Sequence, residues 1–280
     1  NLADVVVNSD RMLPQDVAII IAAHVARLRG RASIKRCVDV LVGGQFGSEG
    51  KGYVMQHIAP EYSVLCRVGG PNAGHSVTNP GDGDKVSFYH LPSGLLHAPD
   101  ADILIGAGAV INPIVLEKEI RLAESLGCPV RNRLLIDTNA MIIDPQHVDS
   151  ERGIVGTIGS TGQGVGEATV DKIRRGGARL AKDHTYLRVG DTREYLERKM
   201  SSGARVMMEG TQGTLLSLHH GYYPFVTSRD TAASGTLGEM GIPPGRVNRS
   251  IMVCRTNPIR VQSPDGYVHT SPRVRGQNRK

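Results

Sequence analysis

The chain has 280 residues, 40 % of them hydrophobic, and its 33 Lys+Arg against 27 Asp+Glu give a formal charge of +6. This length and apolar content can bury a core, which excludes a largely disordered chain. Aromatic residues make up only 4 %, so we expect no stacking platform for nucleic acid and favour small anionic ligands. No apolar stretch approaches the ~20 residues that cross a bilayer, because His24 interrupts the longest candidate, 17–26. We therefore expect a cytoplasmic protein without a membrane partner.

The cysteines are widely separated and show no paired spacing: Cys37, Cys66, Cys128 and Cys254. This pattern argues against a zinc knuckle or a disulfide framework, and it fits a reducing compartment. We expect buried structural thiols.

Residues 1–36 read as an appendage or as the tail of a preceding domain. A short β-like run covers 3–7, and apolar residues at three- and four-residue intervals predict a helix over 14–28. The basic stretch 29–36 follows as a linker. Because the first residue is Asn and the last segment, 273–280, is polar and basic and has no closing element, we expect a fragment.

A different pattern begins at Val38. A β-branched strand over 38–42, a glycine-rich turn over 43–52 and a helix over 53–59 form the arrangement in which backbone N–H groups meet a phosphate. A second strand, 64–68, opens another glycine-rich turn, 69–75. Further strands are predicted at 87–90, 103–106, 134–136, 205–208 and 251–255, and helices at 113–126 and 192–200. These elements predict an α/β fold like that of P-loop NTPases, with an open, mostly parallel sheet covered by helices on both faces.

The first glycine-rich loop reads GGQFGSEGKG over 43–52. It is not a Walker A loop, because Gly52 stands where Ser or Thr should follow the Gly-Lys pair. Its glycines nevertheless let the backbone approach an anion, the following helix offers its dipole, and Lys51 adds a positive charge. The alternative reading is a plain turn between a strand and a helix.

Four more loops carry polar groups. The loop 72–75 brings an amide, Asn72, next to His75, an imidazole suited to proton transfer near neutral pH. The loop 158–166 has hydroxyls among glycines, and the pair at 174–175 is able to clamp a phosphate. The remaining two loops cover 209–214 and 222–228. Each alone is more often a turn, but together they follow several strands, where open α/β sheets bind ligands.

With these residues the chain resembles the adenylosuccinate synthetase family over about 38–260. The matching motifs, in family order, are GGQFGSEGKG, GGPNAGHSV, HLPSGLL, IGAGAVINP, IGSTGQGVG, DKIRR, MEGTQGTLLSLHHGYYPFVTS and RTNPIRV. The resemblance implies a ligase that joins L-aspartate to C6 of a purine nucleotide. In the reaction that the resemblance implies, a nucleoside triphosphate first transfers its γ-phosphoryl group to the 6-oxygen. The resemblance also implies dependence on Mg²⁺.

One residue departs from the family pattern. Where ordinary members carry an Asp that takes the N1 proton of IMP and helps to bind Mg²⁺, this chain has Ser48. A serine hydroxyl has no anionic form at neutral pH and is a poorer Mg²⁺ ligand than a carboxylate, so Ser48 does not simply inherit these roles. Either the protein is inactive or its substrate differs, and the intact remaining motifs favour the second reading. Ser48 leaves room beside the purine 2-position. It resembles the phage-associated branch, which makes N6-succino-2-amino-2′-deoxyadenylate from dGMP.

The resemblance assigns roles residue by residue. It implies catalytic roles for Ser48, Lys51, His75 and Gln212. It places the triphosphate against Gly47, Ser48, Glu49, Gly50, Lys51, Gly52, Gly74, His75 and Ser76. It places the purine nucleotide against Ser48, Asn72, Ala73, Gly74, Ser160, Thr161, Arg175, Gln212 and Thr227. The Mg²⁺ ligands would be Ser48 and the Gly74 carbonyl. Arg175 matches an arginine that reaches a neighbouring subunit's nucleotide, which implies a homodimer.

The resemblance also sets the expected boundaries and the alternatives. We expect a catalytic domain over 37–261 and a basic tail over 262–280, without the family's aspartate-binding loop. The expected activity is ATP-driven, or driven by another purine triphosphate, on dGMP, in the host cytoplasm if a phage encodes the protein. An ordinary synthetase acting on IMP with GTP, or a non-catalytic nucleotide-binding module, is the alternative. The base that removes the N1 proton stays open, with a phosphate oxygen as one possibility.

Overall fold

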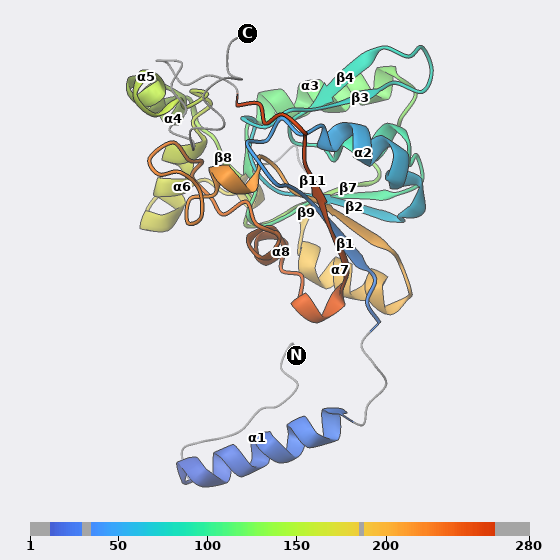
Figure 1. Ribbon diagram of the computed structural model, residues 1–280, viewed down its shortest axis with the longest axis vertical. Helices are drawn as coiled ribbons and strands as arrows, with labels where there is room; N and C mark the ends of the chain where they lie inside the picture. Colours follow the sequence, from blue (N-terminus) through green and yellow to red (C-terminus); the bar gives the residue numbers. More distant parts are fainter. Residues whose placement is uncertain (1–11, 30–34, 185–187, 261–280) are drawn as a thin grey trace. The chain divides into compact units, whose positions relative to one another are not determined.

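The computed structural model describes residues 12–29, 35–184 and 188–260 (Figure 1). Contacts divide the chain into two compact units, Asn1–Lys35 and Arg36–Lys280. The described part of the first unit contains one helix, α1 (Pro14–Arg29), where the apolar spacing predicted it. The β-like run expected over 3–7 lies outside the described residues. None of the described helices combines the length and the apolar character that crossing a membrane requires.

The second unit is built on a seven-stranded sheet in the order β11-β1-β10-β2-β5-β7-β9, and all of its neighbouring strands are parallel. Its strands are β1 (Val38–Gly43), β2 (Val64–Arg67), β5 (Asp102–Ile105), β7 (Leu134–Asp137), β9 (Val189–Gly190), β10 (Val206–Glu209) and β11 (Val247–Val253). Every residue of β1, β2 and β10 is buried, which explains their nearly continuous apolar sequence. This confirms the predicted α/β fold.

Helices cover both faces of this sheet (Figure 1). On one face, Val40 packs in a core that includes Leu196 of α7 (Thr192–Ser201) and Leu237 of α8 (Ala233–Met240). On the other face, the next residue, Leu41, packs with Met55 of α2 (Lys51–Ile58). A third core joins β5 and β7 to α3 (Pro113–Ser125). The alternation of Val40 and Leu41 between two cores is the expected consequence of a strand buried on both sides.

Smaller elements complete the unit. The antiparallel pair is β3 (His75–Thr78) with β4 (Lys85–Phe88), and a short parallel pair is β6 (Val110–Ile111) with β8 (Met141–Ile142). The remaining α-helices are α4 (Pro145–Glu151), α5 (Val155–Ile158) and α6 (Val165–Arg174). The 3-10 turns are η1 (Ala59–Glu61), η2 (Ser93–Leu96), η3 (Arg152–Ile154), η4 (Ala181–Asp183), η5 (Thr214–Leu216) and η6 (Pro244–Arg246).

The structure corrects several predicted bounds. The helix expected over 53–59 begins at Lys51, because Gly50 adopts the left-handed conformation (φ 92°) and serves as its N-cap. The strand expected over 87–90 is β4, two residues earlier, and that expected over 251–255 is β11, which begins at Val247. His75, expected in a loop, is the first residue of β3 and pairs with Phe88.

None of the cysteines forms a disulfide in the part of the chain that the structure describes. Cys37, Cys66 and Cys128 are buried, as expected for structural thiols. Cys254 is exposed, which corrects the expectation for that residue.

Candidate functional site

The expected ligand-binding loops lie at one edge of the sheet. Strands β1, β10 and β2 are adjacent in the sheet order and parallel. The loop 44–50, the loop 210–213 and the loop 68–74 therefore follow their carboxyl ends side by side. This is the place where open α/β sheets bind ligands.

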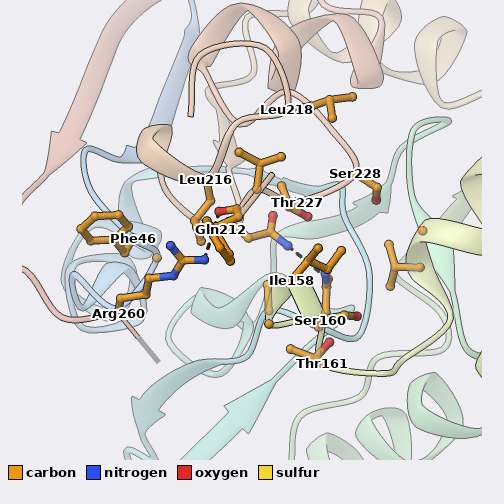
Figure 2. A pocket seen from close by; sticks show the side chains of 18 of the residues that line it. Phe46, Ile158, Ser160, Thr161, Gln212, Leu216, Leu218, Thr227, Ser228 and Arg260 are labelled. Carbon is orange, nitrogen blue, oxygen red and sulfur yellow. Dashed lines mark hydrogen bonds between the residues drawn. The ribbon is translucent and has the colours of Figure 1, made fainter. Parts of the chain in front are cut away.

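A cavity of about 490 Å³ opens between these loops (Figure 2). Many of the expected residues line it: Gly47, Ser48, Asn72, Ala73, Gly74, His75, Ser160, Thr161, Gln212 and Thr227. Other expected residues do not: Glu49, Gly50, Lys51, Gly52, Ser76 and Arg175. The volume suits a nucleotide-sized ligand. The structure thus places most of the residues expected to bind the purine nucleotide in the cavity wall. Most of the residues expected to bind the triphosphate do not line the cavity.

Glu49 occupies the interior of the loop that follows β1. Its Oε1 accepts hydrogen bonds from the backbone N–H groups of Gln45 (3.0 Å) and Gly47 (2.8 Å). Its Oε2 accepts one from Lys51 Nζ at 2.8 Å. Both partners of this ion pair are buried. The carboxylate therefore takes the backbone amides and the ammonium group with which the sequence expected a phosphate to interact.

The ammonium group of Lys51 has a partner for each of its three protons. Besides Glu49, Nζ donates to the carbonyl of Gln212 at 2.6 Å and to the carbonyl of Gly47 at 3.1 Å. Burial lowers the pKa of Lys51, and the charge of Glu49 opposes this shift. An ammonium has three donors and no acceptor, so Lys51 binds a phosphate only by giving up one of these partners.

Gly52, near the start of α2, packs against the backbone of Ser76. A Cβ at Gly52 would lie 2.3 Å from the carbonyl oxygen of Ser76 and 3.1 Å from its nitrogen. The start of α2 therefore packs directly on the backbone of β3, which no larger side chain would allow. Arg175 is different: it is exposed, in the left-handed conformation (φ 63°), at the end of α6. Arg175 does not line the cavity.

His75 contacts a cluster of buried charged residues. Nδ1 of His75 lies in hydrogen-bond contact with Oε1 of Glu209, the last residue of β10. Arg67, the last residue of β2, donates to the same Oε1 at 3.0 Å and to the Ala73 carbonyl at 2.6 Å. The Ser93 hydroxyl donates to Oε1 at 2.6 Å, and its backbone N–H donates to Oε2 at 2.7 Å.

The charges of this group follow from its contacts. Burial raises the pKa of Glu209, but the charge of Arg67 and the contacts with His75 and Ser93 outweigh it and hold the pKa at about 2. Burial, followed by the charge of Arg67, lowers the pKa of His75 to about 4. At neutral pH, then, a carboxylate and a guanidinium flank a neutral imidazole. Arg67 Nη1 lies 3.1 Å from Nδ1 of His75 but has Glu209 Oε1 as its acceptor, and an ionised carboxylate only accepts. We therefore assign the proton of the neutral ring to Nδ1, where it is donated to Glu209.

The other ring nitrogen of His75, Nε2, has no partner in the described part of the chain. This nitrogen is buried, and His75 lines the cavity. Buried polar atoms are normally paired, so an orphaned one in a pocket wall marks a contact made by a ligand. In the neutral ring this nitrogen carries a lone pair, so it accepts a proton or a hydrogen bond.

The buried neutral His75 predicts how stability changes with pH. Below pH 6.5 the unfolded chain protonates this imidazole, whereas the folded protein does not until about pH 4. The free energy of unfolding therefore falls as the pH drops from 6.5 to 4, by roughly 3 kcal/mol from this residue. Denaturant unfolding between pH 7 and 4.5 should show a shallower pH slope in His75→Asn. Glu209 does not obscure this window, since its contribution is lost only from about pH 4.5 toward 2. Equal slopes for the two proteins would contradict the assignment.

The loop 158–166 is held from the side by Glu151. The Ser160 hydroxyl donates to Glu151 Oε1 at 2.9 Å, and the Gly164 N–H donates to Oε2. Glu151 itself lines the cavity. Sequence patterns did not indicate this role, because they predict no helix over 145–151. A carboxylate with both oxygens engaged fixes the loop that carries Ser160 and Thr161.

Arg260 is a further cavity residue that the sequence did not single out. Its guanidinium lies 5.5 Å from the ring centre of Phe225 and 5.9 Å from that of Phe46. One of its nitrogens donates to the Phe225 carbonyl at 3.0 Å. Figure 2 shows it beside Phe46 at the edge of the pocket. The motif RTNPIRV contains Arg260, but the motif alone indicates no role for this residue.

The donors for a metal ion are few. Among the described residues no cluster of three or more His, Cys, Asp and Glu side chains is arranged to hold one. The expected ligands Ser48 and Gly74 both line the cavity and offer only uncharged oxygens. Such a set does not form a resident cage. It fits a Mg²⁺ ion that keeps most of its shell as phosphate oxygens and water.

Comparisons with known proteins bear on the family of the chain. The family model for adenylosuccinate synthetase matches residues 40–188 and 181–271. The adenylosuccinate synthetase of Methanococcus aeolicus is 39 % identical over 230 residues, which cover 79 % of this chain and 67 % of that protein. That of Methanocaldococcus jannaschii is 40 % identical and is covered over 65 % of its length. The chain thus spans about two thirds of the length of the curated relatives that it matches.

Two solved structures are similar. One is the cyanophage S-2L succinoaminodeoxyadenylate synthetase, bound to dGMP and to dATP as an energy donor, with a TM-score of 0.70 and 32 % identity. The match covers 80 % of this chain and 65 % of the cyanophage chain. The fully ligated adenylosuccinate synthetase of Plasmodium falciparum has a TM-score of 0.69 at 24 % identity, covering 78 % and 61 %, and supports the fold alone. The family model and the archaeal relatives show that the chain belongs to the adenylosuccinate synthetase family, a family of C–N bond-forming ligases.

Proposed function

We propose that this protein joins L-aspartate to C6 of dGMP through a 6-phosphoryl intermediate, driven by ATP or another purine triphosphate. The product is N6-succino-2-amino-2′-deoxyadenylate. The observation that carries the proposal is Ser48, which lines the cavity together with His75 and Gln212. The similarity to the cyanophage enzyme bound to dGMP supports it.

Ser48 supports the choice of dGMP through its size and its hydrogen-bonding capacity. A serine is shorter than the aspartate of ordinary members and leaves space for a group on the purine 2-position. Its hydroxyl accepts a hydrogen bond from an exocyclic amine, which guanine has and hypoxanthine lacks. The Ser48 carbonyl is held by Arg255 at 3.1 Å, which fixes this stretch of the loop.

The proposed chemistry rests on the groups around the 6-oxygen. Lys51 exchanges one of its internal partners for a phosphate oxygen and stabilises the charge that develops on the transferring group. His75 acts as an acid at the 6-oxygen only after Nε2 gains a proton, and the negative charge of arriving phosphates favours that protonation. Mg²⁺, when bound, would neutralise phosphate charge, with the Ser48 hydroxyl and the Gly74 carbonyl as the protein's donors.

Three further features remain proposals. We propose a homodimer in which Arg175, exposed at the end of α6, serves the nucleotide of the neighbouring subunit. We assign the catalytic domain to residues 37–261. We also propose that 1–36 lies outside it.

An ordinary adenylosuccinate synthetase acting on IMP is the second candidate. The archaeal relatives of that name are 39–40 % identical to this chain, against 32 % for the cyanophage enzyme. Phosphate release with L-aspartate, ATP and either dGMP or IMP separates the two. Turnover of IMP with none of dGMP would reject our proposal, and dGMP binding without phosphate release would indicate a non-catalytic module.

Exchanging Ser48 for aspartate tests the role of this position. In Ser48→Asp the larger, charged side chain crowds the 2-amino group, so the ratio of kcat/KM for dGMP to that for IMP should fall at least about tenfold. Ser48→Ala is the control for size, since it keeps the space and removes only the hydroxyl. A Ser48→Asp enzyme with higher activity on IMP but an unchanged preference would favour the ordinary synthetase.

A further inference from the structure

A chain of hydrogen bonds runs from the core to the two amide side chains of the cavity. Arg229 Nη1 donates to Thr211 Oγ1 at 3.3 Å, and the Thr211 hydroxyl donates to Gln212 Oε1 at 2.7 Å. Gln212 Nε2 then donates to Asn72 Oδ1 at 3.1 Å. Arg229, Thr211 and Gln212 are buried, and both amides line the cavity.

Arg229 sets the direction of this chain. A guanidinium has donors only, so the contact with Arg229 uses the Thr211 oxygen as an acceptor and leaves the hydroxyl proton for Gln212. If the Gln212 amide were turned over, its NH₂ would face the hydroxyl and the buried hydroxyl proton would lose its acceptor. Arg229 is itself held by Glu239, to which its Nε donates at 3.1 Å.

Arg229 and Thr211 have little room to rearrange. A Cβ at Gly69 would lie 2.5 Å from Arg229 Nη1 and 2.6 Å from Thr211 Oγ1, so the backbone packs directly on both groups. Gln212 has a positive φ of 56°, and its carbonyl accepts from Lys51 at 2.6 Å. The backbone of Gln212 is thus fixed independently of its side chain, and Thr211 controls which end of the amide faces which neighbour.

The fixed amides present a defined pattern of donors. Gln212 Oε1 faces Thr211, so the second Nε2 proton of Gln212 is the group that it offers to a ligand. Asn72 Oδ1 faces Gln212, so Asn72 likewise offers Nδ2. One edge of a 6-oxopurine carries two acceptors, O6 and N7, whereas a 6-aminopurine replaces the first acceptor by a donor. Two donors in the wall match the former and oppose the latter.

We infer that Thr211 is a positioning residue that makes the cavity prefer a 6-oxopurine nucleotide to a 6-aminopurine nucleotide, by fixing the orientation of the Gln212 and Asn72 amides. This inference rests on the proposed function, because it assumes that the purine ring binds against these amides. It adds a determinant at the 6-position, separate from the role of Ser48 at the 2-position. The same pattern disfavours rebinding of a product whose 6-substituent is an amine.

The test compares two ligands that differ only at the 6-position: dGMP and the 5′-monophosphate of 2-amino-2′-deoxyadenosine. Calorimetric titration should give a lower Kd for dGMP with the wild-type protein. In Thr211→Val, which keeps the shape and removes the hydroxyl, the ratio of the two Kd values should shrink by about tenfold, the loss expected for one oriented hydrogen bond. Thr211→Ser keeps the hydroxyl and should restore the wild-type ratio.

Thr231→Val is the matched control. Thr231 is as buried as Thr211, and its hydroxyl donates to the Gly213 carbonyl at 2.8 Å in the same loop, but it contacts neither amide. Thr231→Val should lower the melting temperature of the protein without changing the ratio of the two Kd values. Thr211→Ala removes the hydroxyl without placing a methyl group beside Arg229, and it replaces the valine variant if that variant does not fold.

The outcomes separate the inference from the proposed function. A wild-type ratio in both Thr211→Val and Thr211→Ala, or an equal loss in Thr231→Val, overturns the role of Thr211 while dGMP binding stands. Equal wild-type affinity for the two nucleotides also overturns it. A wild-type protein that binds neither nucleotide rejects the proposed function itself.

Discussion

Glu209→Leu is expected to lower the free energy of unfolding by about 3–5 kcal/mol, because it leaves the buried guanidinium of Arg67 without its carboxylate. The same substitution removes the acceptor for both the Ser93 hydroxyl and its N–H. Denaturant unfolding at pH 7 measures the loss. The double variant Arg67→Met/Glu209→Leu should recover part of it, since it removes both charges.

Glu117→Leu is the matched control for this prediction. Glu117 also contacts two arginines, Arg121 and Arg131, each at 2.7 Å, but all three side chains are at least one-third exposed. Exposed pairs contribute about 0–1 kcal/mol. A Glu209→Leu variant no less stable than Glu117→Leu would contradict the account of the buried group.

His75→Asn is expected to reduce turnover by about 10²–10⁴-fold, the usual contribution of a positioned acid or base. The loss should fall on kcat more than on KM, because the asparagine keeps polar contacts in the wall but transfers no proton. Steady-state phosphate release in the presence of L-aspartate, ATP and dGMP measures it. His57→Asn, an exposed histidine on α2, should leave turnover unchanged. Near wild-type kcat in His75→Asn would remove His75 from the reaction.

The central part of the fold was predictable from the sequence because its strands are buried on both faces. Val38–Gly43 and Val64–Arg67 have nearly continuous apolar sequences, followed by glycines. Such runs identify parallel strands and their ligand-binding ends without any knowledge of tertiary contacts. The helix at 113–125 was equally clear, since Pro113 stands at its first turn and Asn112 caps it.

The region 145–174 was not predictable as helical. Its helices α4 and α6 are short and rich in polar residues, and a glycine-rich segment, 153–164, separates them. They are stabilised by contacts such as that of His147 with Asp171, 24 residues away in the sequence. Propensity is a weak signal where tertiary contacts of this kind decide the structure.

The site residues divide in the same way. The glycine-rich loops and His75 were visible as motifs, because their residue types are unusual at strand ends. The partners that set their chemistry were not visible. Glu209 lies 134 residues from His75, and Gln212 lies 161 residues from Lys51. The pairing of Glu49 with its own loop was also missed, since the sequence assigned that residue to the triphosphate.

A crystal structure of the protein with dGMP in the cavity tests the central proposal most directly. We predict that the Ser48 hydroxyl lies within about 3 Å of the purine 2-amino nitrogen, a normal hydrogen-bond distance. Nε2 of Gln212 should then face the 6-oxygen, and Nε2 of His75 should do so once the triphosphate is also bound. A nucleobase bound with its 2-amino group directed away from Ser48 would contradict the assignment of dGMP as the substrate.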